Sequence, residues 1–324
     1  MNKKIRVGYV FHKNNIFLSG DHFDNTYYNF FIKALGRNPD IDLTLVPTEE
    51  IFDSSKLKNK FDLILLWENS EFGMPREITN LEKLDIPIIS KMGDPSRAKK
   101  SVSVHEKWNI DYYIHFLHED FFHELYPKEF RYKKILFGLE PSLYEKLIPY
   151  DNRINDKILL TGAIGNSKPW SRIINDIKMP EWNAYRVYYL RTKCSKLPFV
   201  KFVQTNKTKY VNDNYPKLLQ QYSASIAATT FNPNIKYWEN SAAGCLTFME
   251  ISDKNRGEYL GYVDGESAIF IDEKNYLDKF NEYLGDKENP KWKRIAKKGR
   301  EYSLRELNND KAANELVLLM RDLI

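Results

Sequence analysis

Short apolar segments alternate with amphipathic stretches along the whole chain, and the alternation restarts once near its middle. This pattern is typical of an α/β protein with mostly parallel sheets, in which strands are buried on both faces and helices connect them. We predict strands at residues 5–11, 42–46, 61–67, 86–90, 112–117 and 133–137, and then at 157–162, 200–204, 225–229, 246–250 and 268–271. We predict helices at residues 25–35, 171–195 with a break near Pro180, 215–222, 237–243, 276–284 and from Trp292 to the end.

The restart divides the chain into two parts. A length of 324 residues suits two domains of about 150 residues each, and the polar segment 145–156 separates the two runs of strands. We therefore predict two Rossmann-like, doubly wound domains, at residues 1–150 and 151–305, and a terminal helix at 306–324 that packs back on the first domain. If the two domains face each other across a cleft, the carboxyl ends of their strands, where ligands bind, lie on both sides of it.

Charge is unevenly distributed between the two halves. Residues 1–150 hold 21 Lys and Arg against 22 Asp and Glu, and residues 151–324 hold 28 against 22. A mildly basic second half suits an anionic small ligand such as a nucleotide diphosphate, whereas nucleic-acid binding usually requires a denser basic stripe. No apolar run is long enough to span a membrane. We expect a cytoplasmic protein, and its surface lysines and tyrosines leave a peripheral contact with an anionic membrane open.

Residues 226–248 carry the most specific pattern. A strand ends near Thr229, Lys236 directly precedes a helix, and Glu239 lies in the first helical turn. Free N–H groups at a helix start, together with Lys236, would form an anion site, and Glu239 could reach a pair of hydroxyl groups such as those of a ribose. Small residues at 241–244 would let the helix pack close to the sheet, with Gly244 ending it. The alternative is a common strand–helix–strand unit in which Glu239 only stabilises a helix start.

This segment resembles the donor-binding signature of GT-B glycosyltransferases, in which a basic residue and a glutamate precede an alanine-glycine helix end. The specific resemblance is to the "glycosyl transferases group 1" type related to spore-maturation glycosyltransferases. Segments 159–172, 261–276 and 295–304 resemble the same group in order and spacing, so that the resemblance covers most of residues 157–304. The first half agrees in strand order and in the segment 138–141.

The resemblance implies a nucleotide-sugar site in the second domain. It implies that Glu239 binds the donor ribose and that Lys236 binds the diphosphate. Tyr237 or Trp238 could stack on the base, although either could instead be a core residue. The donor-binding residues implied in this way are Gly162, Arg172, Lys236, Tyr237, Glu239, Asn240 and Ser241.

Four of these residues have further expectations attached. The backbone around Asn240 and Ser241 would contact the diphosphate, and Gly162 would let the backbone approach the donor. Arg172 is a second candidate for the diphosphate, because a guanidinium can hold two phosphate oxygens. Arg172 could alternatively form an ordinary surface ion pair, and Gly162 could be a simple turn glycine.

A general base for the acceptor hydroxyl should come from the first domain. The loop after the first strand offers Asp21 and His22, which we place first, and Asp94 follows another strand. His12, Asp24 and His105 are further candidates, and Asp24 could instead cap the helix at 25–35.

We predict a reaction without metal and without any cofactor besides the nucleotide-sugar donor. The Asp-x-Asp spacing at residues 40–42 opens a strand and is interpreted as a turn. His115, His118 and His123 need not share one face, so a metal site there is not favoured. A helix start with Lys236 and Arg172 could stabilise a diphosphate leaving group instead. Cys194 and Cys245 have no metal or redox spacing.

The function predicted from these observations is transfer of a sugar from a nucleotide diphosphate to a glycan, a lipid-linked compound or another hydroxyl acceptor. Retaining members of the wider class carry two glutamates eight residues apart, and the residue eight positions before Glu239 is Phe231. A non-catalytic protein that binds a nucleotide-sugar or a glycan is therefore an alternative. A sugar-nucleotide epimerase of the same fold is a third, which interconversion without an acceptor would reveal.

Overall fold

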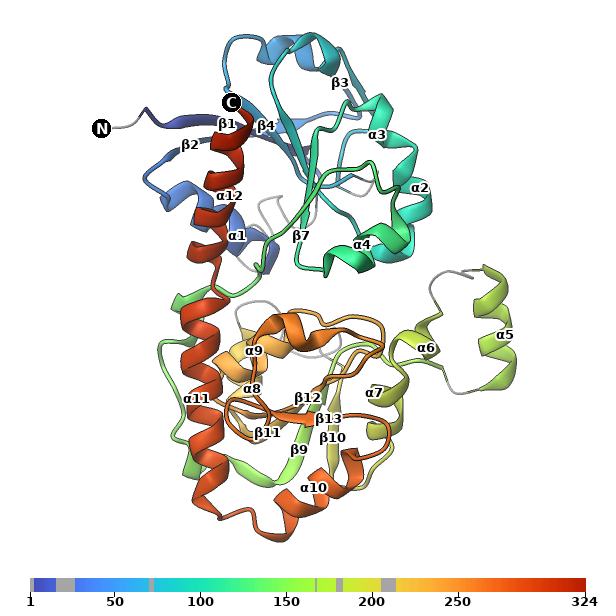
Figure 1. Cartoon of the computed structure of the whole chain (residues 1–324), viewed down its shortest axis with the longest axis vertical. Helices are drawn as coiled ribbons and strands as arrows, with labels where there is room; N and C mark the ends of the chain where they lie inside the picture. The colour runs from blue at the N-terminus through green and yellow to red at the C-terminus, as the bar shows by residue number, and fades with distance from the viewer. Residues whose placement is uncertain (1–2, 16–26, 70–72, 167, 179–182, 205–213) are drawn as a thin grey trace. The chain divides into compact units, whose positions relative to one another are not determined.

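The computed structural model in Figure 1 describes residues 3–15, 27–69, 73–166, 168–178, 183–204 and 214–324. Its internal contacts divide the chain into two compact units. Unit 1 consists of Met1–Glu140 and Asn309–Ile324, and unit 2 consists of Pro141–Asn308. The first crossing between units thus comes before the boundary expected at residue 150, and the chain returns to unit 1 at its end.

Unit 1 is built on a parallel sheet. In the described residues this sheet has six strands in the order β2-β1-β4-β6-β7-β8. Its strands are β1 (Ile5–His12), β2 (Ile41–Thr48), β4 (Leu63–Leu66), β6 (Ile88–Lys91), β7 (Tyr112–His115) and β8 (Tyr132–Lys134). A separate parallel pair, β3 (Ile51–Asp53) with β5 (Glu77–Thr79), was not predicted. Strand β2 lies at the edge of the large sheet, and this position tolerates Pro47, which has no N–H to donate.

The helices of unit 1 follow its strands, and the last one comes from the end of the chain. They are α1 (Tyr27–Arg37), α2 (Ala98–Val102), α3 (Val104–Lys107), α4 (Glu119–Leu125) and α12 (Asn309–Leu323). Helix α12 packs against α1, as Figure 1 shows. Helix α1 continues two residues beyond the predicted end at residue 35, to Arg37.

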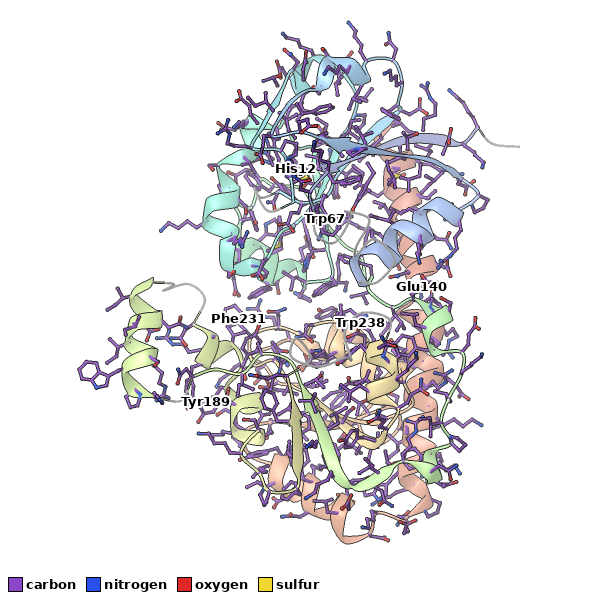
Figure 2. The ribbon with its side chains drawn as sticks, turned by 180° about the vertical axis from the view of Figure 1, so that it is seen from behind. His12, Trp67, Glu140, Tyr189, Phe231 and Trp238 are labelled. Atoms are coloured by element: carbon purple, nitrogen blue, oxygen red, sulfur yellow. The ribbon has the colours of Figure 1, made fainter. Side chains whose placement is uncertain are left out.

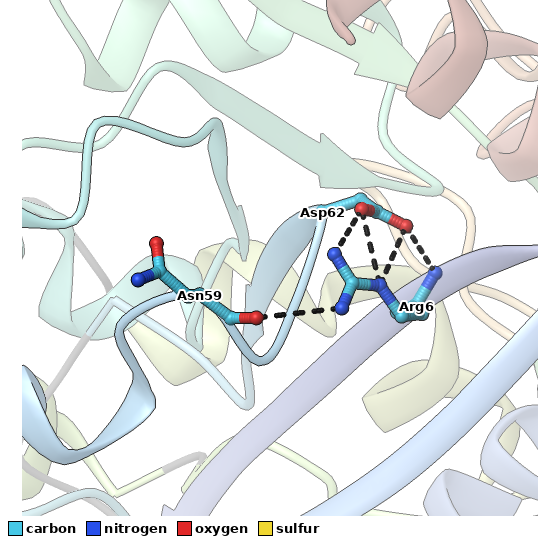
Figure 3. Close-up of polar contacts among 3 residues, drawn as sticks. All are labelled: Arg6, Asn59 and Asp62. Atoms are coloured by element: carbon cyan, nitrogen blue, oxygen red, sulfur yellow. Dashed lines mark hydrogen bonds and ion pairs between the residues drawn. The ribbon is translucent and has the colours of Figure 1, made fainter.

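A forked ion pair joins two parts of the unit 1 sheet, as Figure 3 shows. The Arg6 guanidinium on β1 donates to both carboxylate oxygens of Asp62, with Nη2 2.7 Å from Oδ1, and the Arg6 backbone N–H donates to Oδ2 at 2.9 Å. Asp62 directly precedes β4, so the pair fixes the entry of that strand beside β1. The Arg6 guanidinium also holds the pKa of Asp62 below its usual range.

The chain's return to unit 1 is anchored at the start of α12. Asn309 is fully buried, its N–H donates to the Leu139 carbonyl at 2.8 Å, and its Oδ1 accepts from the Gly138 N–H at 2.7 Å. Arg37 on α1 adds ion pairs with Glu140 and with Asp310 on α12. Two chain segments far apart in sequence are thereby held side by side.

Unit 2 is a second parallel α/β layer structure. Its described sheet has five strands in the order β10-β9-β11-β12-β13. The strands are β9 (Ile154–Thr161), β10 (Val200–Val203), β11 (Tyr222–Ala227), β12 (Leu246–Glu250) and β13 (Ile269–Ile271). The helices are α5 (Pro169–Lys178), α6 (Ala184–Val187), α7 (Tyr189–Cys194), α8 (Tyr215–Leu219), α9 (Lys236–Ala242), α10 (Tyr276–Gly285) and α11 (Pro290–Glu306).

The predicted strands of both halves each overlap a strand of the structure, and the α/β class with parallel sheets is confirmed. Two helix predictions need correction. The helical stretch expected at 171–195 is three helices, and the single tail helix is two, α11 and α12, separated at Leu307 and Asn308. In the part of the chain that the structure describes, no helix is long and apolar enough to cross a membrane.

Asn309→Ala should lower the free energy of unfolding by about 1–3 kcal/mol, because it leaves the buried Gly138 N–H without its acceptor. Urea denaturation measures this change. Asn308→Ala is the matched control, since Asn308 is half-buried and its side chain donates to the carbonyls of Leu304 and Arg305 in α11. Equal effects of the two substitutions would contradict the proposed anchor.

Candidate functional site

The unit 2 sheet has a point where its strand order reverses. Strand β9 has β10 on one side and β11 on the other, and the chain continues from β11 to β12, away from β9. Ligands of open parallel sheets bind outside the carboxyl ends of the strands at such a point. Here those ends are Thr161 of β9 and Ala227 of β11.

A buried arginine spans the two strand ends. Arg191 on α7 is 2% exposed. Its Nη1 donates to the Ala163 carbonyl at 3.0 Å, and its Nε donates to the Ala228 carbonyl at 2.7 Å. Its Nη2 donates to Thr229 Oγ1 at 3.0 Å. The loops after β9 and β11 are therefore held by one side chain, which we did not single out from the sequence.

Lys236 lies over the same point. Its Nζ is 3.0 Å from the Tyr215 hydroxyl, which is itself 2.7 Å from Thr161 Oγ1. Gly162 has φ of +99°, and a Cβ there would lie 2.8 Å from Lys236 Cε and 3.0 Å from Arg191 Nη1. The positive φ favours glycine here, and a Cβ would crowd both cations beside this backbone. The structure thus brings Gly162 and Lys236 together, and adds Tyr215.

Glu239 is a buried carboxylate one turn further along α9. It is 6% exposed, and its Oε2 accepts no hydrogen bond from any residue that the structure describes. Burial raises the pKa of Glu239 to about 7, and the Lys236 ammonium opposes that rise. The Glu239 charge also contributes to the raised pKa values of Tyr144 and Tyr215. An unpartnered acceptor of this kind costs stability unless a ligand donates to it.

The start of α9 does not offer the free N–H groups that we expected. The Lys236 N–H donates to Asn234 Oδ1 at 3.1 Å, and the Tyr237 N–H donates to the Asn234 carbonyl at 3.0 Å. The N–H groups of Trp238 and Glu239 both donate to the Ile235 carbonyl. The prediction of an anion site made by free N–H groups is therefore wrong, because the tight turn before the helix uses them. The charge of Lys236 remains.

Three predicted donor residues point into the fold. Tyr237 has no exposed surface, and its hydroxyl donates to the Glu250 carbonyl at 2.9 Å, so its ring is not placed to stack on a base. Asn240 Nδ2 donates to the Ile226 carbonyl, and Ser241 Oγ donates to Thr247 Oγ1. Trp238, labelled in Figure 2, is also fully buried. These side chains fix α9 against the sheet.

Two further arginines hold the end of α9. Arg153 Nη1 donates to the Ala243 carbonyl at 3.0 Å, and Arg300 Nη1 donates to the Ala242 carbonyl. Arg300 Nη2 also donates to the Tyr144 carbonyl at 2.6 Å. Burial raises the pKa of the Tyr144 hydroxyl, and the Glu239 charge adds to that rise. The helix therefore ends as predicted, before Gly244, whose φ is +76°.

Arg172 does not join this group. It lies on α5, which projects from the body of unit 2 in Figure 1. Its guanidinium stacks on the Tyr185 ring at 3.6 Å. The contacts of Arg172 are thus with α6 and not with Lys236 or Glu239, so its predicted role at the diphosphate is not supported by this arrangement.

In unit 1, Asp21 and His22 lie outside the described residues. Asp94 follows β6, is exposed, and accepts from the Ser96 N–H at 2.8 Å as the cap of a short helical turn. His12 at the end of β1 lies 3.4 Å from Glu50, and Figure 2 shows it near Trp67, which follows the neighbouring strand β4. The role of these four residues as candidate general bases stays a prediction.

Buried ionisable side chains gather at the same carboxyl edge of the unit 1 sheet. Lys91 at the end of β6 is 3.6 Å from Glu68 and 4.0 Å from the centre of the Trp67 ring. His115 at the end of β7 is buried, and burial lowers its pKa to about 3, so its imidazole is neutral. His118 instead caps α4 by accepting from the Asp120 N–H. Within the described ranges, no three His, Cys, Asp or Glu side chains are arranged to hold a metal ion.

Gly162→Ala should destabilise the protein by at least about 1 kcal/mol more than Gly265→Ala. Both glycines have positive φ, so both substitutions strain the backbone, but no atom lies within 4 Å of a Cβ at Gly265. The difference measured by urea denaturation reports the crowding against Lys236 and Arg191. Equal losses would contradict the close packing described for Gly162.

The pH dependence of the free energy of unfolding should report the protonation of Glu239. Its pKa rises from 4.5 to about 7 on folding, so the folded protein binds an extra proton between these values. Stability is therefore highest below pH 4.5 for this group and falls by about 3 kcal/mol as pH rises to 7. Glu239→Gln should lack this part of the slope and keep the part due to Glu250, whose pKa burial also raises to about 7. An unchanged pH profile would show that Glu239 stays ionised.

No protein-family model matches the chain, and no curated protein matches it by sequence. Solved structures do match. HepE from Anabaena in complex with UDP and glucose is 11% identical, with a TM-score of 0.57 over 99% of this chain and 100% of that one. An alpha-glucosyltransferase in complex with UDP-glucose and DNA containing an abasic site is 10% identical, with a TM-score of 0.60 over 98% and 100%. A glycosyltransferase from Rickettsia africae is 12% identical, with a TM-score of 0.56 over 100% and 99%.

These structural matches extend over nearly the full length of each chain. Because the sequence identities are low, the matches show the fold alone. The spore-maturation subtype stays a prediction. The parallel sheet of each unit, its strand order and the full-length structural matches agree: the chain has the fold of the GT-B glycosyltransferases.

Proposed function

We propose that the protein is a glycosyltransferase that moves a sugar from a nucleotide diphosphate to a hydroxyl acceptor. The observation that carries this proposal is the buried Glu239 carboxylate, whose Oε2 has no partner in the described chain, with Lys236 one turn away at the strand-order reversal of unit 2. A hydroxyl donor and an anion are the two groups that this pair would bind. A nucleotide diphosphate carries both.

Each residue of the pair has a distinct task in this proposal. The ribose hydroxyls would donate to Glu239, which favours the ionised form of a carboxylate that burial alone tends to protonate. Lys236 would contact the diphosphate, and its charge would stabilise the oxygen that leaves when the bond to the anomeric carbon breaks. Gly162 would leave space for the donor beside Lys236. These roles require no metal, and we propose a metal-independent reaction.

The acceptor hydroxyl attacks the anomeric carbon, and a base takes its proton. Asp21, His22 and Asp94 remain the proposed bases. The proposed acceptor is a glycan, a lipid-linked compound or another hydroxyl compound. For the donor, UDP is the first nucleotide to test, because HepE and the alpha-glucosyltransferase are described in complexes with UDP or UDP-glucose.

A second candidate is a protein that binds the nucleotide-sugar without transferring it. Phe231, labelled in Figure 2, favours this candidate, because it stands eight residues before Glu239 and is 36% exposed. A phenyl ring there offers neither charge nor a hydrogen bond to a donor sugar. The two candidates share the nucleotide site and differ in turnover.

Lys236→Ala should weaken UDP binding by about 10–100-fold, because it removes a charge-assisted contact with the diphosphate. Isothermal titration and the ligand-dependent rise of the melting temperature both measure this. Lys217→Ala on α8 is the matched control, since Lys217 is exposed and its Nζ donates to Asn214 Oδ1, the neighbour at the start of the same helix. Glu239→Ala should reduce the response to UDP and to uridine, whereas Lys236→Ala should reduce the response to UDP alone.

Failure of UDP and other nucleoside diphosphates to bind the folded wild-type protein would contradict both candidates. If UDP binds, incubation with UDP-glucose and other UDP-sugars separates them. Release of UDP, by slow hydrolysis or by transfer to added hydroxyl compounds, supports the transferase. Tight binding with no release of UDP under any acceptor condition favours the binding protein.

A further inference from the structure

Helix α5 carries its apolar side chains on one face. Trp170, Ile173, Ile174 and Ile177 fall within roughly 100° of the helix circumference, given about 100° per residue. They are exposed by 77%, 49%, 51% and 75%, respectively. Such a group of large apolar side chains on a soluble surface marks an interaction site more often than a chance arrangement.

The polar face of α5 is the one that contacts the rest of unit 2. Asp176 Oδ1 accepts from Asn183 Nδ2 at 2.6 Å and from Arg186 Nη2 at 3.2 Å. Arg172 stacks on Tyr185. The helix is thus mounted by its polar side, and its apolar side faces outward, which reverses the usual arrangement of a surface helix. Figure 1 shows α5 projecting from the body of unit 2.

We propose that the apolar face of α5 inserts shallowly into the surface of an anionic lipid bilayer. A tryptophan among aliphatic residues on an amphipathic helix is typical of helices that lie in the membrane interface. Residues 166–186, which include α5, hold four Lys and Arg against two Asp and Glu, so this segment has a net positive charge that complements an anionic headgroup layer.

The size of the face favours lipid over a protein partner. Four large apolar side chains at these exposures present on the order of 500 Å² of surface, since a large aromatic side chain presents about 150–250 Å². A stable protein interface surrounds such an apolar centre with a polar rim, to a total of about 800 Å² from each partner. A bilayer needs no complementary shape, so a small protruding apolar face is sufficient for it. This inference adds a location to the proposed glycosyltransferase, and within that function it favours an acceptor borne on a lipid.

The test uses the full chain with vesicles of phosphatidylcholine, either pure or with added phosphatidylglycerol. We expect the wild type to sediment with the anionic vesicles, with a blue shift of tryptophan emission. Trp170→Phe should remove most of that shift while the protein still sediments. Ile173→Asp with Ile177→Asp should lower the apparent partition coefficient by at least about tenfold.

The matched control is Leu277→Asp with Leu318→Asp, which adds the same two charges at exposed leucines of α10 and α12. It should bind the anionic vesicles as the wild type does. Circular dichroism should show both double variants folded, with an unchanged response to UDP, so that loss of vesicle binding is separable from failure of the nucleotide site.

Three results would overturn the proposal. The wild type could fail to sediment with anionic vesicles, or the α5 double variant could sediment as the wild type does. Alternatively, gel filtration of the wild type without lipid could show a dimer that the α5 double variant converts to a monomer, which would assign the face to a second copy of the chain.

Discussion

The loops that follow β9 and β11 are joined by one buried guanidinium, and the candidate site rests on this connection. Arg191 donates to the carbonyls of Ala163 and Ala228, which lie beyond the ladders of the two strands and would otherwise lack these donors. It also lies against Gly162, which in turn faces Lys236. Displacing the guanidinium would therefore leave two carbonyls without partners and shift the backbone beneath the lysine.

A buried cation of this kind needs compensation, and the structure provides it at the end of β12. The Glu250 carboxylate interacts electrostatically with Arg191, and burial raises the pKa of Glu250 to about 7. Asn255 Nδ2 donates to the carbonyls of Glu250 and Thr229, and so connects the end of β12 to the loop after β11. Arg191, Thr229, Asn255 and the end of β12 thus form one connected polar group, and Lys236 lies beside it at Gly162.

The strands and their parallel order could be predicted from the sequence because each short apolar run is a local signal. Lys236, Glu239 and Gly244 could be singled out because they share one short segment. Arg191 and Tyr215 could not, since their importance depends on contacts with residues about thirty to fifty positions away, at the ends of strands that meet only in the folded sheet. The prediction of free N–H groups at the start of α9 was wrong for a related reason: the Asn234 side chain turns back and accepts a hydrogen bond from one of them.

Helix α5 shows where hydrophobic periodicity stops being informative. The spacing of Trp170, Ile173 and Ile177 fixes that a helix forms and that it has an apolar face. It does not fix which face meets the protein, because that depends on partners elsewhere in the chain. Here Asn183 and Tyr185 on the following segment contact the polar side chains Asp176 and Arg172, so that the polar face of α5 meets the protein and the apolar face does not. An arrangement that leaves four large apolar side chains in water is unfavourable for an isolated protein. Insertion of these side chains into a lipid bilayer would remove that cost.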